Sequence, residues 1–275
     1  MSPTHGFLYG TSRAGKTTFA AHWAKPDSPL LVVTREPGPA SAALGASGVV
    51  GISKLVVPKT PEELFVLLEY TDAYLKKHLA GFMPGMVLFD NLQGLQQLII
   101  GEGARSEQEV AGVKVPAQPA TGIMRLPVAR ADAATGQPAQ MDYGILGRQT
   151  RRFLNLVDQL PFSTLITATE ALAFDEKYRA ETAGMNAQAA AGRPRKVMGY
   201  PSTEGKMILS SLPALVSGFF LRLTKKGDKY TIHTKVHSDS NGVEWFADPR
   251  GLPSTLSSEI DWTNKSAYDI LLAGR

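Results

Sequence analysis

Apolar residues in this chain fall into short runs that are rich in β-branched residues and bounded by glycine, proline or other turn residues. Such runs are typical of strands buried on both faces of a parallel sheet. Segments with helical spacing lie between them, so the pattern predicts an α/β fold in which helices cover a mostly parallel central sheet. Antiparallel strands are expected near the C-terminus. The predicted strands are 6–10, 30–34, 54–58, 85–92, 163–170, 219–223, 230–236 and 243–247.

Three segments are predicted to be helices. Residues 15–24 follow the first strand directly, and residues 143–160 repeat apolar residues at helical spacing. The clearest helix is 60–79, because Thr60 is placed to cap its first turn and Glu63 to complete a capping box. Helices in these positions alternate with the strands, as an α/β fold requires.

Two long segments do not fit this alternation. Residues 101–141 and 171–206 are rich in small and polar residues and are expected to be loops. Loops of this length inside a compact domain are either functional or disordered. Both follow strands at the same edge of the inferred sheet, where α/β proteins place their ligands. We predict that residues 1–275 form a single domain, with C-terminal strands and a tail at about 219–275.

The stretch YGTSRAGKTTF, residues 9–19, matches the phosphate-loop pattern G-x-x-x-x-G-K-[ST]. Its glycines allow a tight turn in which backbone N–H groups converge on a polyphosphate. The lysine supplies charge for the β- and γ-phosphates, and the threonine that follows can ligate Mg²⁺. A chance match in a chain of this length has a probability on the order of 1%, and this match also lies between a predicted strand and a predicted helix. The sequence thus predicts that ATP and Mg²⁺ are bound by Gly10, Thr11, Ser12, Arg13, Ala14, Gly15, Lys16, Thr17 and Thr18.

Polar residues at the ends of other strands are candidates for the rest of the site. Asp90 ends an apolar strand and is predicted to lie on the metal side, although acids at strand ends are often only turn residues. Glu36 follows the 30–34 strand and is predicted to act on the attacking water; the alternative is a surface glutamate beside a Pro-Gly turn. Thr169 or Glu170 is a candidate for sensing the γ-phosphate, or else a polar residue that merely ends its strand.

Composition limits the expected location of the protein and its expected partners. The chain has 275 residues and no cysteine, which excludes disulfides and thiolate metal sites within it and makes a reducing cytoplasm the expected location. The N-terminal residues lack the pattern of a signal peptide, and the apolar run 207–221 is too short to span a bilayer, so no membrane partner is expected. The net charge of +4 is compatible with nucleic acid, but it equally fits a lysine-rich solvated surface.

Four stretches in this order resemble RecA-like core ATPases, most of all the compact phage-encoded type associated with single-strand annealing and recombination. The stretches are LYGTSRAGKTT, LLVVTREPG, GMVLFDNL and QMDYGILGRQTRRFLNLVDQLPFSTLITATE. The similarity runs from about residue 6 to residue 170, and EWFADPRGLPSTL later in the chain is a fainter match to the segment that closes the family's core. The phosphate loop is generic to many NTPases, whereas the glutamate after the second strand and the last of the four stretches are more discriminating.

The resemblance implies how the protein would work. Members of that family form rings or filaments with ATP between neighbouring subunits, so a homo-oligomer is expected. Lys16 and Thr17 would hold phosphate and Mg²⁺, Asp90 would lie on the metal side, and Glu36 would act on the water. Arg250, in the Asp-x-Arg pattern that begins at Asp248, would act as a cation on a neighbour's ATP, or else be a turn residue in a surface salt bridge.

The same resemblance implies DNA as a partner, because loops after the central strands of the family face DNA. Single-stranded DNA is the expected form, and a single-strand DNA-binding protein is a further partner. Cations in flexible loops suit contact with phosphates that does not depend on sequence; the alternative is a solvated loop without a ligand. The candidate residues are Arg193, Arg195 and Lys196 in the second long segment and Arg125 and Arg130 in the first.

The leading hypothesis from the sequence is therefore an oligomeric, DNA-binding recombination ATPase of a phage, located in the cytoplasm of its bacterial host. A hexameric helicase or a DNA-packaging motor on the same core is one alternative. A nucleotide-dependent scaffold that hydrolyses little ATP is another.

Overall fold

The central sheet of the computed structural model carries the candidate site at one edge. The structure describes residues 3–69, 79–100, 107–110, 113–116, 143–174, 197–203 and 212–263. Its strands are β1 (His5–Tyr9), β2 (Leu30–Thr34), β3 (Ser53–Val56), β4 (Met86–Asp90), β5 (Glu107–Val110), β6 (Val113–Pro116), β7 (Ser163–Ala168), β8 (Glu170–Phe174), β9 (Val197–Pro201), β10 (Phe219–Lys226), β11 (Lys229–His233), β12 (His237–Ser238), β13 (Glu244–Trp245) and β14 (Glu259–Asp261). Its helices are α1 (Lys16–Ala21), α2 (Pro37–Ala46), α3 (Pro61–Glu69), α5 (Leu92–Ile100), α6 (Tyr143–Asp158) and α10 (Leu212–Leu215), with a 3₁₀ turn at Val50–Ile52.

The strands of the central sheet run in the order β14-β11-β10-β1-β7-β4-β2-β3. From β10 through to β3 each strand pairs with its neighbour in parallel, whereas β11 and β14 pair antiparallel. This confirms the predicted fold class, a mostly parallel α/β sheet of the RecA-like P-loop type with antiparallel strands near the C-terminus. β7 lies between β1 and β4, so the strand that leads into the phosphate loop and the strand that ends in Asp90 are not neighbours.

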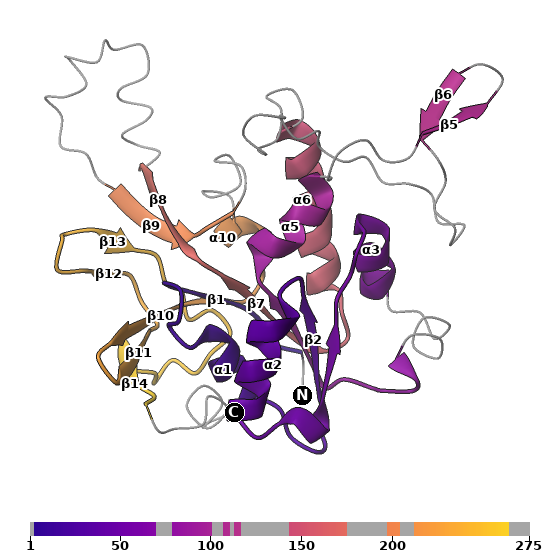
Figure 1. The fold of residues 1–275 in the computed structure, drawn as a ribbon. Coiled ribbons are helices and arrows are strands. Elements are labelled where there is room, and N and C mark those ends of the chain that lie inside the picture. The colour runs from indigo at the N-terminus through magenta and orange to yellow at the C-terminus, as the bar shows by residue number, and fades with distance from the viewer. Residues whose placement is uncertain are drawn as a thin grey trace, which may run out of the picture.

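Helices pack on both faces of this sheet (Figure 1). Phe7 and Tyr9 of β1 belong to a buried cluster with residues of α3, α5 and α6. Leu8 belongs to a second cluster with residues of α1 and α2. Because successive side chains of a strand point to opposite faces, the consecutive apolar residues Phe7, Leu8 and Tyr9 bury β1 between two helical layers. Continuous apolar runs such as LLVV in β2 follow from the same requirement.

The predicted helices begin as expected and differ in length. Glu63 N donates a hydrogen bond of 3.2 Å to Thr60 Oγ1, as a cap requires. The reciprocal bond of the capping box goes one residue further back, because Glu63 Oε2 accepts from Lys59 N at 2.7 Å. α3 is described to Glu69, and the rest of the predicted helix 60–79 lies mostly outside the described residues. α1 begins at Lys16 and ends at Ala21, so it is shorter than the predicted 15–24.

The expectation that 171–206 is one long loop is wrong at both of its ends. β8 and β9 pair antiparallel there and belong to a second sheet of order β12-β13-β9-β8. Within 101–141 the described residues form the β5–β6 hairpin. Glycine, alanine and proline have low strand propensity, so the sequence pattern did not predict these strands. Pairing with neighbouring strands stabilises them instead.

Several further elements were not predicted from the sequence. α2 begins at Pro37, where the sequence suggested a Pro-Gly turn, because proline fits the first position of a helix. α5 follows Asp90 almost directly. β10 continues through Lys225 and Lys226, beyond the predicted strand 219–223, and the β10–β11 turn lies at residues 227–228. Within the described part of the chain, no helix has the length and apolar character that crossing a bilayer requires.

Candidate phosphate and magnesium site

The phosphate loop joins β1 to α1. Its two glycines have backbone conformations that other residues adopt only with strain. Gly10 has φ +154° and Gly15 has φ +82°. A Cβ atom on Gly10 would lie 2.0 Å from the carbonyl oxygen of Leu223, and one on Gly15 would lie 3.0 Å from Cζ2 of Trp262. Both glycines are therefore required by backbone conformation and by the close approach of their neighbours.

Lys16 lies against this loop. Its Nζ donates hydrogen bonds to the carbonyl oxygens of Gly10 at 3.0 Å and Thr11 at 2.8 Å. Burial lowers the pKa of Lys16, while the charges of Asp90 and Glu170 partly oppose that shift. A half-buried ammonium held at the loop by two neutral acceptors is placed to exchange them for the oxygens of a phosphate, which would pair its positive charge with a negative one.

Thr17 connects the loop to the other side of the site. Its Oγ1 donates a hydrogen bond of 2.8 Å to Asp90 Oδ2. Oδ1 of the same carboxylate accepts a short hydrogen bond from Oγ1 of Thr167, on the intervening strand β7. Both oxygens of Asp90 are thereby oriented by hydroxyl groups, and the predicted metal pair, Thr17 and Asp90, is brought together.

These donors fit Mg²⁺ bound with a nucleotide. Mg²⁺ keeps several waters and takes one or two protein oxygens together with phosphate oxygens. Among the described residues there is no group of three or more histidine and acidic side chains that could hold a metal unaided. The hydroxyl of Thr17 and the carboxylate of Asp90 are thus suited to share a metal with a triphosphate rather than to bind one alone.

Glu36 lies at the same edge of the sheet. Thr34, the last residue of β2, pairs in register with Asp90. Glu36 N donates a hydrogen bond of 2.9 Å to Thr34 Oγ1, and Glu36 precedes α2 as its N-cap residue. The Glu36 side chain is exposed. The structure therefore places Glu36 at the same edge of the sheet as Asp90, just after the carboxyl end of the neighbouring strand.

The two sensor candidates have different partners. The hydroxyl of Thr169 accepts a hydrogen bond from Nε2 of Gln93, and Thr169 N donates to Oε1 of the same side chain at 3.4 Å. Glu170 Oε2 forms an ion pair with Arg222 Nη2 at 3.1 Å. Glu170 nevertheless remains close enough to Lys16 for its charge to influence the pKa of that lysine.

Gln93 and Arg222 were missed by the sequence prediction. Gln93 lies three residues after Asp90, and a polar residue so soon after the strand-end acid was the available signal. Arg222 is the one charged residue within the apolar run FFLRL, which was a stronger signal, because a buried charge requires a partner. Arg222 pairs in register with Tyr9, the residue before the phosphate loop.

Arg222 is the centre of a polar cluster beside the loop. Besides Glu170, its Nη1 lies 2.9 Å from Nε2 of His237, and its guanidinium carbon lies 3.6 Å from the ring centroid of Trp245. The rings of His237 and His233 stack at 3.7 Å. Burial, and after it the neighbouring His237 and Arg222, lower the pKa of His233 to about 4, so His233 is neutral at pH 7.

Arg250 does not approach the phosphate loop of its own chain. Its Nη2 and Nε donate to Asp248 Oδ2 at 2.8 and 2.9 Å. Asp248 is bridged to Phe220 near the start of β10, whereas the phosphate loop follows the carboxyl end of β1. Arg250 is an exposed turn residue in a salt bridge, which matches the alternative interpretation of this residue, and its role on a neighbouring subunit stays a prediction. The predicted DNA contacts Arg125, Arg130, Arg193, Arg195 and Lys196 lie outside the described residues.

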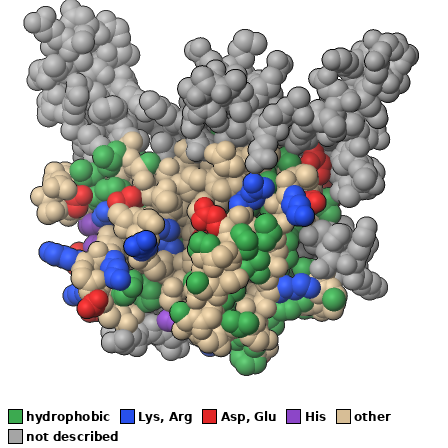
Figure 2. Space-filling model, viewed as in Figure 1, with side chains coloured by type: hydrophobic (Ala, Val, Ile, Leu, Met, Phe, Trp, Pro, Cys, Tyr) green, Lys and Arg blue, Asp and Glu red, His purple; other side chains and the backbone are tan. Residues whose placement is uncertain are grey.

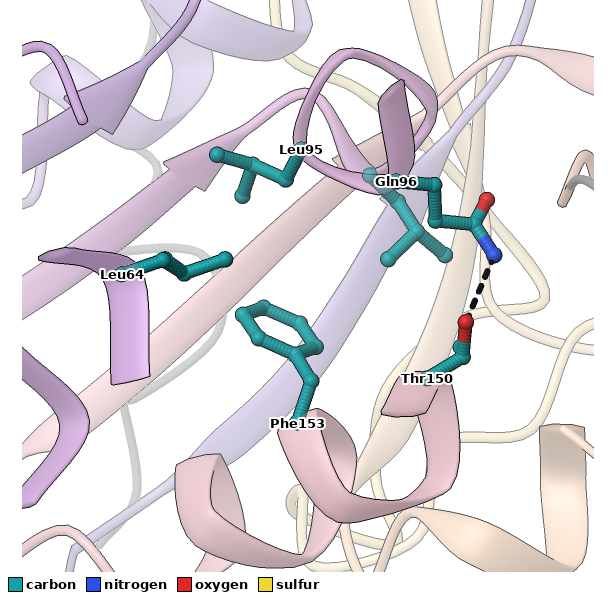
Figure 3. A pocket seen from close by; sticks show the side chains of 6 residues that line it. Leu64, Leu95, Gln96, Thr150 and Phe153 are labelled. Carbon is teal, nitrogen blue, oxygen red and sulfur yellow. Dashed lines mark hydrogen bonds between the residues drawn. The ribbon is translucent and has the colours of Figure 1, made fainter. Parts of the chain in front are cut away.

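A small gap between α3, α5 and α6 is separate from this site (Figure 3). It is lined by Leu64, Leu92, Leu95, Gln96, Thr150 and Phe153, and it has no room for a water molecule. Gln96 Nε2 donates a hydrogen bond of 3.0 Å to Thr150 Oγ1 at its wall. The gap is a feature of helix packing rather than a binding site.

The sheet order and the glycine-framed loop between β1 and α1 are consistent with a RecA-like P-loop core. No family model matches the chain, and neither does any curated protein. Among solved structures, the ATPase domain of a phage replicative helicase aligns with 91% of this chain and 78% of its own length, at 11% sequence identity and a TM-score of 0.41. A likeness of that degree says nothing about function, which rests on the residues of the site.

Proposed function

We propose that this protein binds ATP with Mg²⁺ and hydrolyses it, and that it does so as a homo-oligomer acting on DNA in phage recombination or replication. The observation that carries the proposal is the hydrogen bond from Thr17 Oγ1 to Asp90 Oδ2, 2.8 Å long. It joins the residue that follows the phosphate-loop lysine to the acid at the end of a strand two places away in the sheet. A surface turn that matched the phosphate-loop pattern by chance would not require an acid at this position.

The residues at this edge supply the parts that phosphoryl transfer to water needs. Lys16 and the amides of the loop hold the phosphates and balance their charge, and Thr17 and Asp90 hold the metal side. Mg²⁺, when bound, neutralises charge that develops on the phosphate oxygens. Glu36 orients the attacking water and takes its proton. Arg250 of a neighbouring subunit supplies a further positive charge in the transition state.

The DNA-binding part of the proposal is supported by charge and by the family resemblance. The chain carries 29 basic and 25 acidic residues, and basic residues recur in both long segments, at Arg125, Arg130, Arg193, Arg195 and Lys196. Contacts of this kind are made to phosphates and weaken steeply with salt. ATP turnover is therefore expected to respond to DNA most strongly at low ionic strength.

One measurement tests both parts. The rate of ATP hydrolysis is compared with and without single-stranded DNA at low salt, with Lys16→Ala as the control for contaminating ATPases. Stimulation by DNA that disappears in Lys16→Ala is the expected result. The proposal would be refuted if the wild-type protein showed no ATP turnover and did not bind a non-hydrolysable ATP analogue. DNA-stimulated turnover accompanied by unwinding of a duplex would instead assign the helicase or motor alternative.

A further inference from the structure

The hairpin formed by β10 and β11 projects past the phosphate loop. Arg222 of β10 pairs with Tyr9, the last residue of β1, so residues 223–226 continue beyond the edge from which the loop begins. At roughly 3.3 Å per residue this extension is about 13 Å long. It begins in contact with the loop, because Leu223 O is the atom nearest to a Cβ built on Gly10.

One face of this hairpin is turned toward α1. Leu223 is buried in the cluster that contains Phe19 of α1. Lys225, two residues further on, lies on the same face, whereas Lys226 lies on the opposite face. Lys225 pairs in register with Tyr230, and its Nζ lies 4.8 Å from the centroid of the Tyr230 ring. Figure 2 shows lysine and arginine side chains gathered on the side of the molecule where Figure 1 places β11 and β14.

Tyr230 is supported from behind by Trp262. The two ring centroids are 5.1 Å apart, and Trp262 is itself buried, with an edge-on contact to Phe19 at 5.0 Å. Both aromatic rings reach the phosphate loop, since a Cβ on Gly15 would lie 3.0 Å from Trp262 and 3.2 Å from Tyr230. The Tyr230 ring is half-buried, so part of it faces solvent beside the loop.

We propose that Tyr230, backed by Trp262 and flanked by Lys225, binds the base of the nucleoside triphosphate by stacking. This inference rests on the proposed function and assigns the base to the β10–β11 hairpin of the same chain. A rigid aromatic ring that is held next to the phosphate loop offers a base a π-face and little else to recognise. The base displaces the Lys225 ammonium from the ring, and the ammonium, on a flexible exposed chain, then lies beside the phosphates. Purines, which have the larger π-surface, are the expected bases.

Binding of two ligands that differ only in the nucleoside separates this role from a role in phosphate binding. Kd is measured for a non-hydrolysable ATP analogue and for inorganic tripolyphosphate, both with Mg²⁺, on the wild-type chain and on Tyr230→Leu. Loss of stacking is expected to raise Kd for the analogue about tenfold and to leave Kd for tripolyphosphate within about twofold of the wild-type value. Tyr230→Phe, which keeps the ring, should restore most of the affinity for the analogue.

Two lysines on opposite faces of β10 provide a matched pair in case Tyr230→Leu fails to fold. Lys225→Ala is expected to raise Kd about threefold for the analogue and for tripolyphosphate alike, because the displaced ammonium lies beside the phosphates, whereas Lys226→Ala leaves both unchanged. The inference is overturned if Tyr230→Leu weakens both ligands equally or weakens neither, or if the two lysine variants behave alike. Failure of the wild-type chain to bind either ligand would refute the proposed function itself, which distinguishes the two failures.

Discussion

Thr17 and Asp90 are separated by 73 residues in the chain and joined by a hydrogen bond of 2.8 Å between a hydroxyl and a carboxylate. The bond crosses β7, whose Thr167 holds the other carboxylate oxygen. Three elements thus fix the orientation of one acid. Such precision at a strand end is what a metal bound together with a phosphate requires, because a carboxylate free to rotate would not hold the metal in a defined position.

Replacement of Asp90 by asparagine is expected to reduce Mg²⁺-dependent ATP turnover by about 10- to 100-fold. The amide keeps the size of the side chain and one acceptor oxygen, so the fold should persist. Turnover is measured against Mg²⁺ concentration, with circular dichroism as the check on folding. Turnover that is unchanged at every Mg²⁺ concentration would contradict a role for Asp90 on the metal side.

Replacement of Glu36 by glutamine separates hydrolysis from binding. Loss of a general base is expected to lower kcat by roughly 10²- to 10⁴-fold, with Kd for a non-hydrolysable ATP analogue unchanged. The exposed Glu36 side chain makes no capping hydrogen bond to α2, so folding should not be affected. Near-normal kcat in Glu36→Gln would favour the nucleotide-dependent scaffold over an enzyme that uses this base.

Replacement of Gly10 by alanine is expected to destabilise the fold and to abolish nucleotide binding. The added Cβ would lie 2.0 Å from Leu223 O, at a backbone φ of +154° that side chains rarely adopt. Gly147→Ala in α6 is the matched control, because nothing lies within 4 Å of its Cβ position. That control should be stabilised by about 0.5–1 kcal/mol in chemical denaturation. Equal stability of the two variants would contradict the close packing of β10 against the loop.

Breaking the ion pair between Glu170 and Arg222 is expected to destabilise the protein by about 3 kcal/mol. Both side chains are largely buried, at 19% and 8% exposed, and Glu170→Gln leaves the Arg222 charge without its counter-ion. Denaturation of Glu170→Gln, Arg222→Met and the double variant measures the coupling between them. Loss of ATP turnover without any loss of stability in Glu170→Gln would instead support the predicted sensor role.

The stability of the fold should decrease below pH 6.5. His233 has its pKa lowered to about 4 by burial and by the neighbouring His237 and Arg222, whereas in the unfolded chain it titrates near 6.5. Glu259 approaches its Nδ1 to 3.4 Å but makes no hydrogen bond with it, and Thr224 Oγ1 lies 3.1 Å from its Nε2. Since the unfolded state binds the proton first, stability is complete above pH 6.5 and is lost as the pH falls toward 4.

The expected loss from His233 is about 2–3 kcal/mol, somewhat below the full value of the pKa shift because the side chain is still 10% exposed. Denaturation of the wild-type chain and of His233→Asn at pH 7.5 and pH 4.5 provides the measurement. The decrease with pH should be smaller in the variant. Identical decreases in the two proteins would show that His233 is not the responsible group.

The local sequence was sufficient to predict the strands that are buried on both faces. The run LLVVT is β2, residue for residue, because only a strand covered by helices on both sides has use for four consecutive apolar residues. The phosphate loop was equally local, since its glycines and Lys16-Thr17 form one continuous motif. β8 and β9 were missed because their alanine, glycine and proline carry weak strand propensity, and pairing with each other stabilises them. α2 was missed because the prolines and glycine at its start are also typical of a turn.

The sequence by itself determined which residues could form the site, namely the loop with Lys16 and Thr17 and the acids Asp90 and Glu36 at strand ends. Only the tertiary structure decided that Thr17 forms a hydrogen bond with Asp90 across β7. It also decided that Glu170 forms an ion pair with Arg222, and that the rings of Tyr230 and Trp262 lie against Gly15. The physical reason is that a motif specifies its own backbone through nearby residues. Contacts between strands far apart in the chain depend on the order and register of the whole sheet.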